Sequence, residues 1–81
     1  MKYENPEFQK AFGKHFRSLR EKKGIGMRKF ALQADIEYSQ LSKIERGVSS
    51  PTITTIYGLA EALGVPHQEL FNFKFSLKTK K

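Results

Sequence analysis

The sequence of 81 residues contains no cysteine and no tryptophan. The absence of cysteine excludes a disulfide framework and any zinc site built on thiolates. The two histidines, His15 and His67, are too few and too far apart to indicate a metal cluster, and we expect no cofactor. No apolar run approaches the ~18 residues that a membrane span needs, and residues 1–6 lack the apolar region of a signal peptide. We therefore expect one small domain over residues 1–81, located in the cytoplasm and not bound to a membrane.

Acidic residues are also scarce, with 8 Asp and Glu against 15 Lys and Arg, which gives a net charge of +7. Such a balance favours acidic partners, nucleic acid among them. Residues 1–24 carry seven cations against three anions, whereas residues 25–50 carry four against three. The spread of cations indicates a folded basic surface rather than one polybasic block. On the first predicted helix Lys10, Lys14 and Arg17 share a face, which either contacts phosphate or is merely solvated.

Helical periodicity dominates the chain. Phe8, Phe12, Phe16 and Leu19 recur at spacings of four, four and three, which predicts one apolar helix face. Asn5 suits the N-cap of this helix, and Gly24 suits its end. The sequence therefore predicts an all-α bundle of five short helices, in which residues 6–71 form the core. The expected helices cover residues 6–23, 27–34, 38–46, 53–63 and 67–71.

The fourth predicted helix begins after Thr52, a suitable N-cap, and ends before Gly64. We expect one apolar set of side chains along it, made of Ile53, Ile56, Leu59, Ala60 and Leu63.

Residues 72–81 form a basic tail of different character. Phe71, Phe73, Phe75 and Leu77 alternate with polar residues, which is the period of a strand. Two interpretations stay open. Either Phe71 and Phe73 complete the core and the rest is disordered, or the tail forms a short strand that pairs with its counterpart in a second subunit.

Residues 27–46 hold the most informative pattern. Two helices that cross steeply need a small side chain at the contact, and Ala31 supplies it. The turn between them needs a residue that tolerates a left-handed backbone, which Asp35 does. With Leu41 and Ile44 facing inward, the third predicted helix presents an outward polar face that suits the major groove of DNA. That face comprises Tyr38, Ser39, Ser42, Lys43 and Arg46.

At these residues the sequence resembles the phage-repressor and Cro-like helix-turn-helix regulators, the xenobiotic-response-element class with a lambda-repressor-like fold. The similarity covers about residues 8–71. Its most specific parts are the segments Ile44-Glu45-Arg46-Gly47, Pro51-Thr52 and Leu59-Ala60-x-x-Leu63-Gly64-Val65.

The resemblance implies a role for each matching position. Family members hold a phosphate with a Gln side chain where this sequence has Met27, which cannot donate a hydrogen bond, so Arg28 or the helix N-terminus must replace it. Tyr38 either contacts the DNA or packs on the turn. The implied base-reading residues are Tyr38, Ser39, Ser42 and Lys43. The implied contacts to the DNA backbone are Gly26, Met27, Arg28, Gln40, Arg46, Ser49 and Thr52.

Two further groups are implied in the same way. Arg20 and Glu45 are expected to form a structural ion pair rather than to touch DNA. A homodimer interface is expected near the fifth helix, where His67 is either a pH-sensitive group or simply exposed. The expected interface residues are Pro66, His67, Leu70, Phe71 and Phe73.

We therefore expect a small homodimeric transcriptional regulator that binds a pseudo-palindromic operator in double-stranded DNA. One alternative is an antitoxin that blocks a toxin partner, and another is a controller of a restriction-modification system. No nucleophile–base pair, paired carboxylates or metal ligands appear, so we expect no enzyme and no catalytic residues.

Overall fold

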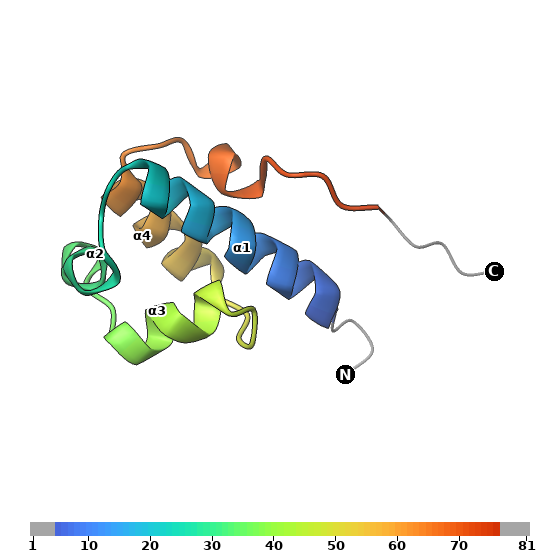
Figure 1. The fold of residues 1–81 in the computed structure, drawn as a ribbon, viewed down its shortest axis with the longest axis horizontal. Helices are drawn as coiled ribbons and strands as arrows, with labels where there is room; N and C mark the ends of the chain where they lie inside the picture. The colour runs from blue at the N-terminus through green and yellow to red at the C-terminus, as the bar shows by residue number, and fades with distance from the viewer. Residues whose placement is uncertain (1–4, 77–81) are drawn as a thin grey trace.

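A computed structural model describes residues 5–76 of the chain. Four α-helices and one 3-10 helix follow one another (Figure 1), and the predicted all-α class is confirmed. The fifth element is a 3-10 turn rather than an α-helix, and two helices end one residue earlier than predicted. The elements are α1 (Pro6–Lys22), α2 (Met27–Ala34), α3 (Tyr38–Glu45), α4 (Ile53–Leu63) and η1 (His67–Phe71).

The helix ends follow the local chemistry of the sequence. The side chain of Asn5 accepts a hydrogen bond from the backbone N–H of Phe8 at 3.0 Å, which caps α1. The hydroxyl of Thr52 accepts one from the N–H of Thr55 at 3.1 Å and caps α4 in the same way. Gly64 ends α4 with a left-handed backbone at φ 76°.

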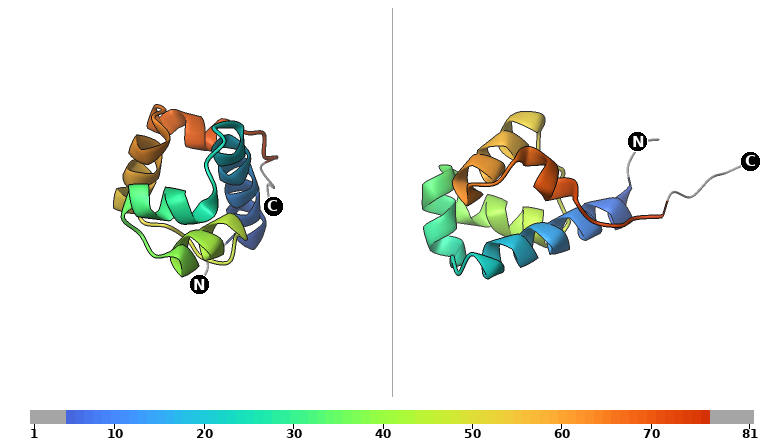
Figure 2. Two further views of the ribbon diagram at one scale, coloured as in Figure 1. Left: turned by 60° about the vertical axis from the view of Figure 1, so that its left-hand side comes forward. Right: turned by 90° about the horizontal axis from the view of Figure 1, so that it is seen from above.

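The helices surround one core, with α1 running between α3 and η1 (Figures 1 and 2). Phe16 and Phe30 meet edge to face at the centre, with ring centroids 5.3 Å apart. Ala31, predicted as the small residue at the helix crossing, is buried in the same cluster. Each helix contributes to the set of completely buried large side chains, which are Phe16, Phe30, Leu41, Ile44, Leu59 and Leu70.

Ile53 corrects the predicted core. It belongs to the apolar set expected along α4, but its side chain is 87% exposed. Ile53 is the first residue of α4, whereas Ile56, three residues on, packs against the core and Leu59 is completely buried. Phe8 is also more exposed than predicted. It lies at the surface although it shares the periodicity of the buried Phe12 and Phe16.

The tail lies against α1 and forms no strand within residues 5–76. The Phe73 ring packs 5.5 Å from Phe8 and 5.3 Å from the His15 ring, and Phe75 meets Phe8 edge to face at 5.1 Å. Phe73 therefore packs against the core, as one of the two interpretations expected, but Phe71, which the same interpretation placed in the core, is exposed. Leu77, the last residue of the alternating pattern, lies outside the described residues.

Candidate nucleic-acid interface

The turn between α2 and α3 has the geometry that the sequence predicted. Asp35 adopts a left-handed backbone at φ 57° and ψ 46°, and it is the sole non-glycine residue to do so between residues 5 and 76. The N–H of Ile36 then donates to the carbonyl of Ala31 at 3.0 Å, which closes the turn. Leu41 and Ile44 are completely buried, so one side of α3 is anchored in the core.

The far end of α3 is held by a backbone contact that sequence reasoning missed. A Cβ placed on Gly13 of α1 would lie 2.6 Å from the carbonyl oxygen of Glu45 and still closer to that of Ile44. Gly47, at φ 75°, approaches the backbone of Lys10 in the same way. Two glycines thus let α1 and the end of α3 touch directly, which fixes the position of α3. A glycine inside a predicted helix was the available signal.

The Arg20–Glu45 pair is present and buried. The Nε and Nη2 groups of Arg20 donate to the two carboxylate oxygens of Glu45 at 2.6 and 2.9 Å, and Nη1 donates to the carbonyl of Ile25 at 2.7 Å. Only 6% and 5% of the two side chains are exposed. The hydrogen bond with Glu45 raises the pKa of Arg20 against the opposing effect of burial. The pair therefore ties α1, the α1–α2 turn and α3 together.

The outward face of α3 is polar and free of intramolecular contacts at its centre. Ser39, Gln40 and Lys43 are exposed, and none of them has a partner within the described chain. Ser42 is half-buried, and its hydroxyl accepts a hydrogen bond from Nε of Arg46 at 3.1 Å. Between this face and the loop before α4 lies an open groove of about 380 Å³. Predicted DNA-contacting residues that line it are Ser39, Gln40, Lys43, Ser49 and Thr52.

The N-termini of α2 and α3, unlike that of α1, have no side-chain cap. Gly26 and Glu37 precede α2 and α3 without offering a side-chain cap, so the first-turn N–H groups of both helices have no side-chain acceptor. The Met27 side chain packs against the core instead of facing outward. Of the predicted phosphate contacts in this region, the backbone of residues 26–28 and the exposed Arg28 side chain are the groups available to a ligand.

A cation–π contact joins the two helices of the motif at their N-terminal ends. The guanidinium carbon of Arg28 lies 4.8 Å from the centre of the Tyr38 ring, and both side chains are exposed. Sequence reasoning assigned both residues to the DNA interface but did not foresee that they touch. Ten residues separate them, and no periodic pattern marks such a pair.

The expected dimer residues occupy different environments. Pro66, His67 and Phe71 are exposed, and Phe73 is half-buried under the tail. Leu70 is completely buried in the protomer's own core, so its side chain presents no surface to a partner. The prediction that Leu70 contacts a second subunit is therefore wrong, because the short η1 turns this side chain into the core.

Lys10, Lys14 and Arg17 are exposed on α1, and Arg17 pairs with Glu21 at 3.1 Å. No group of three or more His, Cys, Asp or Glu side chains gathers anywhere between residues 5 and 76. In the same range, none of the helices combines the length and the apolar character that crossing a membrane requires.

Comparison with known proteins places this geometry in a family. A family model described as a helix-turn-helix domain matches residues 13–74. The HTH-type transcriptional regulator y4dJ of Sinorhizobium fredii is 39% identical over 64 residues, which are 79% of this chain and 83% of the relative. The control protein C.BamHI of Bacillus amyloliquefaciens is 32% identical over 63 residues, or 76% of this chain and 78% of that protein.

A solved structure agrees. The restriction-modification controller protein C.AhdI of Aeromonas hydrophila superimposes with a TM-score of 0.79 at 31% identity, covering 80% of this chain and 98% of the controller. The resemblance stated from the sequence is thereby confirmed. With a family model that spans most of its length and relatives above 30% identity, the chain belongs to the helix-turn-helix family of DNA-binding transcriptional regulators.

Proposed function

We propose that the protein binds a pseudo-palindromic operator in double-stranded DNA as a homodimer, with α3 of each copy in the major groove. The observation that carries this proposal is the outward face of α3, where Ser39, Gln40 and Lys43 are exposed and have no partner in the described chain. Donors and acceptors left free on a rigidly anchored helix are what base readout needs.

The other assignments follow from position. Ser42 lies on the same helix, although its hydroxyl already accepts a bond from Arg46. The uncapped N-terminus of α2, at Gly26, Met27 and Arg28, offers N–H groups to phosphate. The groove beside α3 is lined by Gln40, Ser49 and Thr52, and phosphate contacts there would set the depth of α3 in the DNA.

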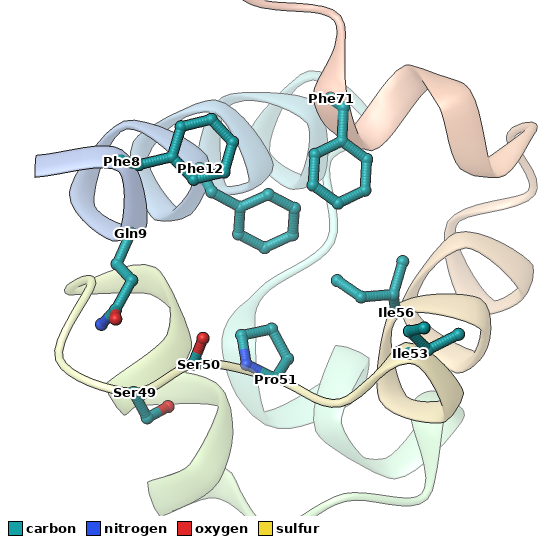
Figure 3. Close-up of a pocket in the computed structure, with 9 residues that line it drawn as sticks. All are labelled: Phe8, Gln9, Phe12, Ser49, Ser50, Pro51, Ile53, Ile56 and Phe71. Atoms are coloured by element: carbon teal, nitrogen blue, oxygen red, sulfur yellow. The ribbon is translucent and has the colours of Figure 1, made fainter. Parts of the chain in front are cut away.

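The interface between two copies is proposed at an apolar pocket on the other side of the loop before α4. The pocket has a volume of about 180 Å³ and lies between the start of α1, this loop, the start of α4 and η1 (Figure 3). Its rim carries the surface residues Phe8, Ile53 and Phe71. None of its lining residues is charged, although 28% of the chain is charged. They are Phe8, Gln9, Phe12, Ser49, Ser50, Pro51, Ile53, Ile56 and Phe71.

A second copy of this chain is the occupant that the charges favour. Each copy carries a net charge of +7, so two copies repel unless they meet where cations are absent. Ser49, Ser50 and Pro51 line both the apolar pocket and the polar groove beside α3. Copies that meet at the pocket therefore hold their α3 helices near one another, as a palindromic site requires. Phe71 of η1 lines this pocket, whereas Pro66 and His67 line a separate hollow beside the end of α4.

The dimer is tested by Ile53→Glu, which places a like charge on each side of the interface. We expect the dimer dissociation constant, measured by sedimentation equilibrium, to rise at least about tenfold, the equivalent of about 1.4 kcal/mol. Leu32→Glu is the matched control, because Leu32 is 83% exposed on α2 and does not line the pocket. Equal dissociation constants for both variants would refute the proposed interface.

DNA binding is tested by selecting duplexes from a random pool and then titrating salt. We expect a pseudo-palindrome with half-site centres about 34–36 Å apart. If about six phosphates are neutralised, log affinity falls against log salt with a slope near −5. Selection of an unrelated set of sequences, or a flat salt response, would contradict the proposal.

Control of restriction-modification genes is the second candidate, because the similar protein C.AhdI is a restriction-modification controller and C.BamHI is a control protein. The selected operator should then lie upstream of adjacent methyltransferase or endonuclease genes. An operator located elsewhere in the genome would remove this candidate and leave the general function intact.

A further inference from the structure

Arg28 differs from the other three arginines of the chain in what its nitrogens do. Arg17 pairs with Glu21, Arg20 pairs with Glu45, and Arg46 donates to Ser42. Arg28 has no hydrogen-bond or ion-pair partner within residues 5–76, and its recorded contact is with the face of the Tyr38 ring. Its N–H donors are therefore unused.

Stacking on a ring holds a guanidinium without consuming its donors. The ring attracts the cation through its face, whereas all five N–H groups of the guanidinium lie in the guanidinium plane and point outward at its edge. A side chain restrained in this way also loses less conformational freedom when it binds. The Tyr38 ring therefore holds Arg28 ready for a ligand that accepts hydrogen bonds from the edge.

The position of the stack indicates which ligand this is. Tyr38 is the first residue of α3, and the N-terminal residues of a recognition helix are the ones that contact base edges. Arg28, in the first turn of α2, lies over the Tyr38 ring at the start of α3. In the major groove a guanidinium edge matches the O6 and N7 acceptors of guanine. On the exposed part of α3 itself, Lys43 is the one cation with no intramolecular partner.

We infer that Arg28 reads a guanine in each half-site, and that Tyr38 is a positioning residue that holds the Arg28 guanidinium against the base edge. This inference rests on the proposed function. It changes two expectations, because Arg28 was expected to grip a phosphate and Tyr38 was expected to read a base.

The test compares base preference and salt dependence for the full-length chain and four variants. An operator is first selected from a random pool of duplexes. Each of the four bases is then placed at every half-site position, and the affinity of each duplex is measured at several salt concentrations. We expect the unaltered protein to prefer guanine about ten- to a hundredfold at one position. In Arg28→Ala that preference falls below about threefold, and the salt slope changes by less than about 0.3.

Two Tyr38 variants separate positioning from contact. Tyr38→Phe keeps the ring and is expected to keep the guanine preference within about threefold. Tyr38→Ala removes the ring and is expected to lose most of it, although no charge changes. Lys29→Ala is the control, because Lys29 is the neighbouring exposed cation on α2 without a recorded ring contact. This variant should weaken binding equally for all sequences.

A phosphate contact by Arg28 would give a different result, namely an unchanged guanine preference and a salt slope reduced by about 0.9. That outcome overturns the inference and leaves the proposed function standing, as does a half-site in which no guanine is selected. Equal guanine preferences for Tyr38→Ala and the unaltered protein overturn the role of Tyr38.

If the unaltered protein selects no sequence at all, the proposed function fails as well. Circular dichroism confirms that each variant is folded, since all three substituted side chains are exposed.

Discussion

Arg20→Met tests how much of the stability depends on the buried ion pair with Glu45. Methionine keeps an unbranched stem but removes the hydrogen bonds to the carboxylate and to the carbonyl of Ile25. The Glu45 side chain, 5% exposed, is then left without its cation. Breaking a buried pair in this way costs about 3–5 kcal/mol.

This cost is large for a domain of 81 residues. The free energy of unfolding of such a domain is about 4–12 kcal/mol, and each kcal/mol shifts Tm by about 4–8 °C. We therefore expect Tm to fall by at least about 12 °C, measured by circular dichroism at pH 7, with urea unfolding at 25 °C as a second measurement.

A double-mutant cycle separates the pair from the packing of its side chains. Glu45→Met alone leaves Arg20 buried without its carboxylate, so it should cost about as much as Arg20→Met. The double variant replaces both charges by apolar groups and should be nearly as stable as the unaltered protein. We expect a coupling energy of about 3 kcal/mol or more. A Tm for Arg20→Met within about 2 °C of the unaltered protein, or two costs that simply add, would refute the reasoning.

The pH dependence of this difference also follows from the pair. Because the hydrogen bond to Glu45 raises the pKa of Arg20, the stabilisation from its charge is fully present at every pH below the ordinary pKa of arginine. The difference in unfolding free energy between the unaltered protein and Arg20→Met should therefore be the same at pH 7 and pH 9. A difference that shrinks toward pH 9 would mean that Arg20 loses its proton there.

Three further substitutions, and one control, test the contacts that position the motif. Gly13→Ala should destabilise the domain by about 1–3 kcal/mol in urea unfolding, because its Cβ meets backbone oxygens of α3. Gly58→Ala is the control and should stabilise the domain by about 0.5–1 kcal/mol, because the space around Gly58 is open. Changes in unfolding free energy of the same sign for both variants would contradict the close approach at Gly13. Asp35→Gly should raise Tm, since glycine adopts a left-handed backbone without steric cost, and a lower Tm would count against this. Thr52→Ala should cost about 1 kcal/mol and increase hydrogen exchange at Thr55, whose N–H the hydroxyl caps.

Much of the fold could be predicted because helix boundaries are decided locally. Asn5 and Thr52 cap the helices that the sequence assigned to them, and Asp35 takes the left-handed conformation that the turn needs. Each of these effects depends on a few residues that are close together along the chain. The inward positions Leu41 and Ile44 followed in the same way from helical periodicity.

The remaining features depend on where separate helices meet, which periodicity does not encode. Ile53 shares the pattern of Ile56 and Leu59, yet its side chain is exposed whereas theirs pack against or within the core. Gly13 inside a predicted helix indicates an unusual position, but the sequence does not say that the end of α3 lies against its backbone. The stack of Arg28 on Tyr38 requires the crossing angle of α2 and α3, so only the structure reveals it.

The direct contact of α1 with the end of α3 also bears on how binding specificity can diversify. Since α3 is held by inward side chains and by backbone at Gly13 and Gly47, its exposed residues Ser39, Gln40 and Lys43 have no part in holding it. Changes at Ser39 and Lys43, which we propose contact bases, should therefore alter the preferred base sequence without moving the helix. The scaffold and the proposed base-reading surface are separable, so a library varied at these two positions offers a route to regulators with new operators.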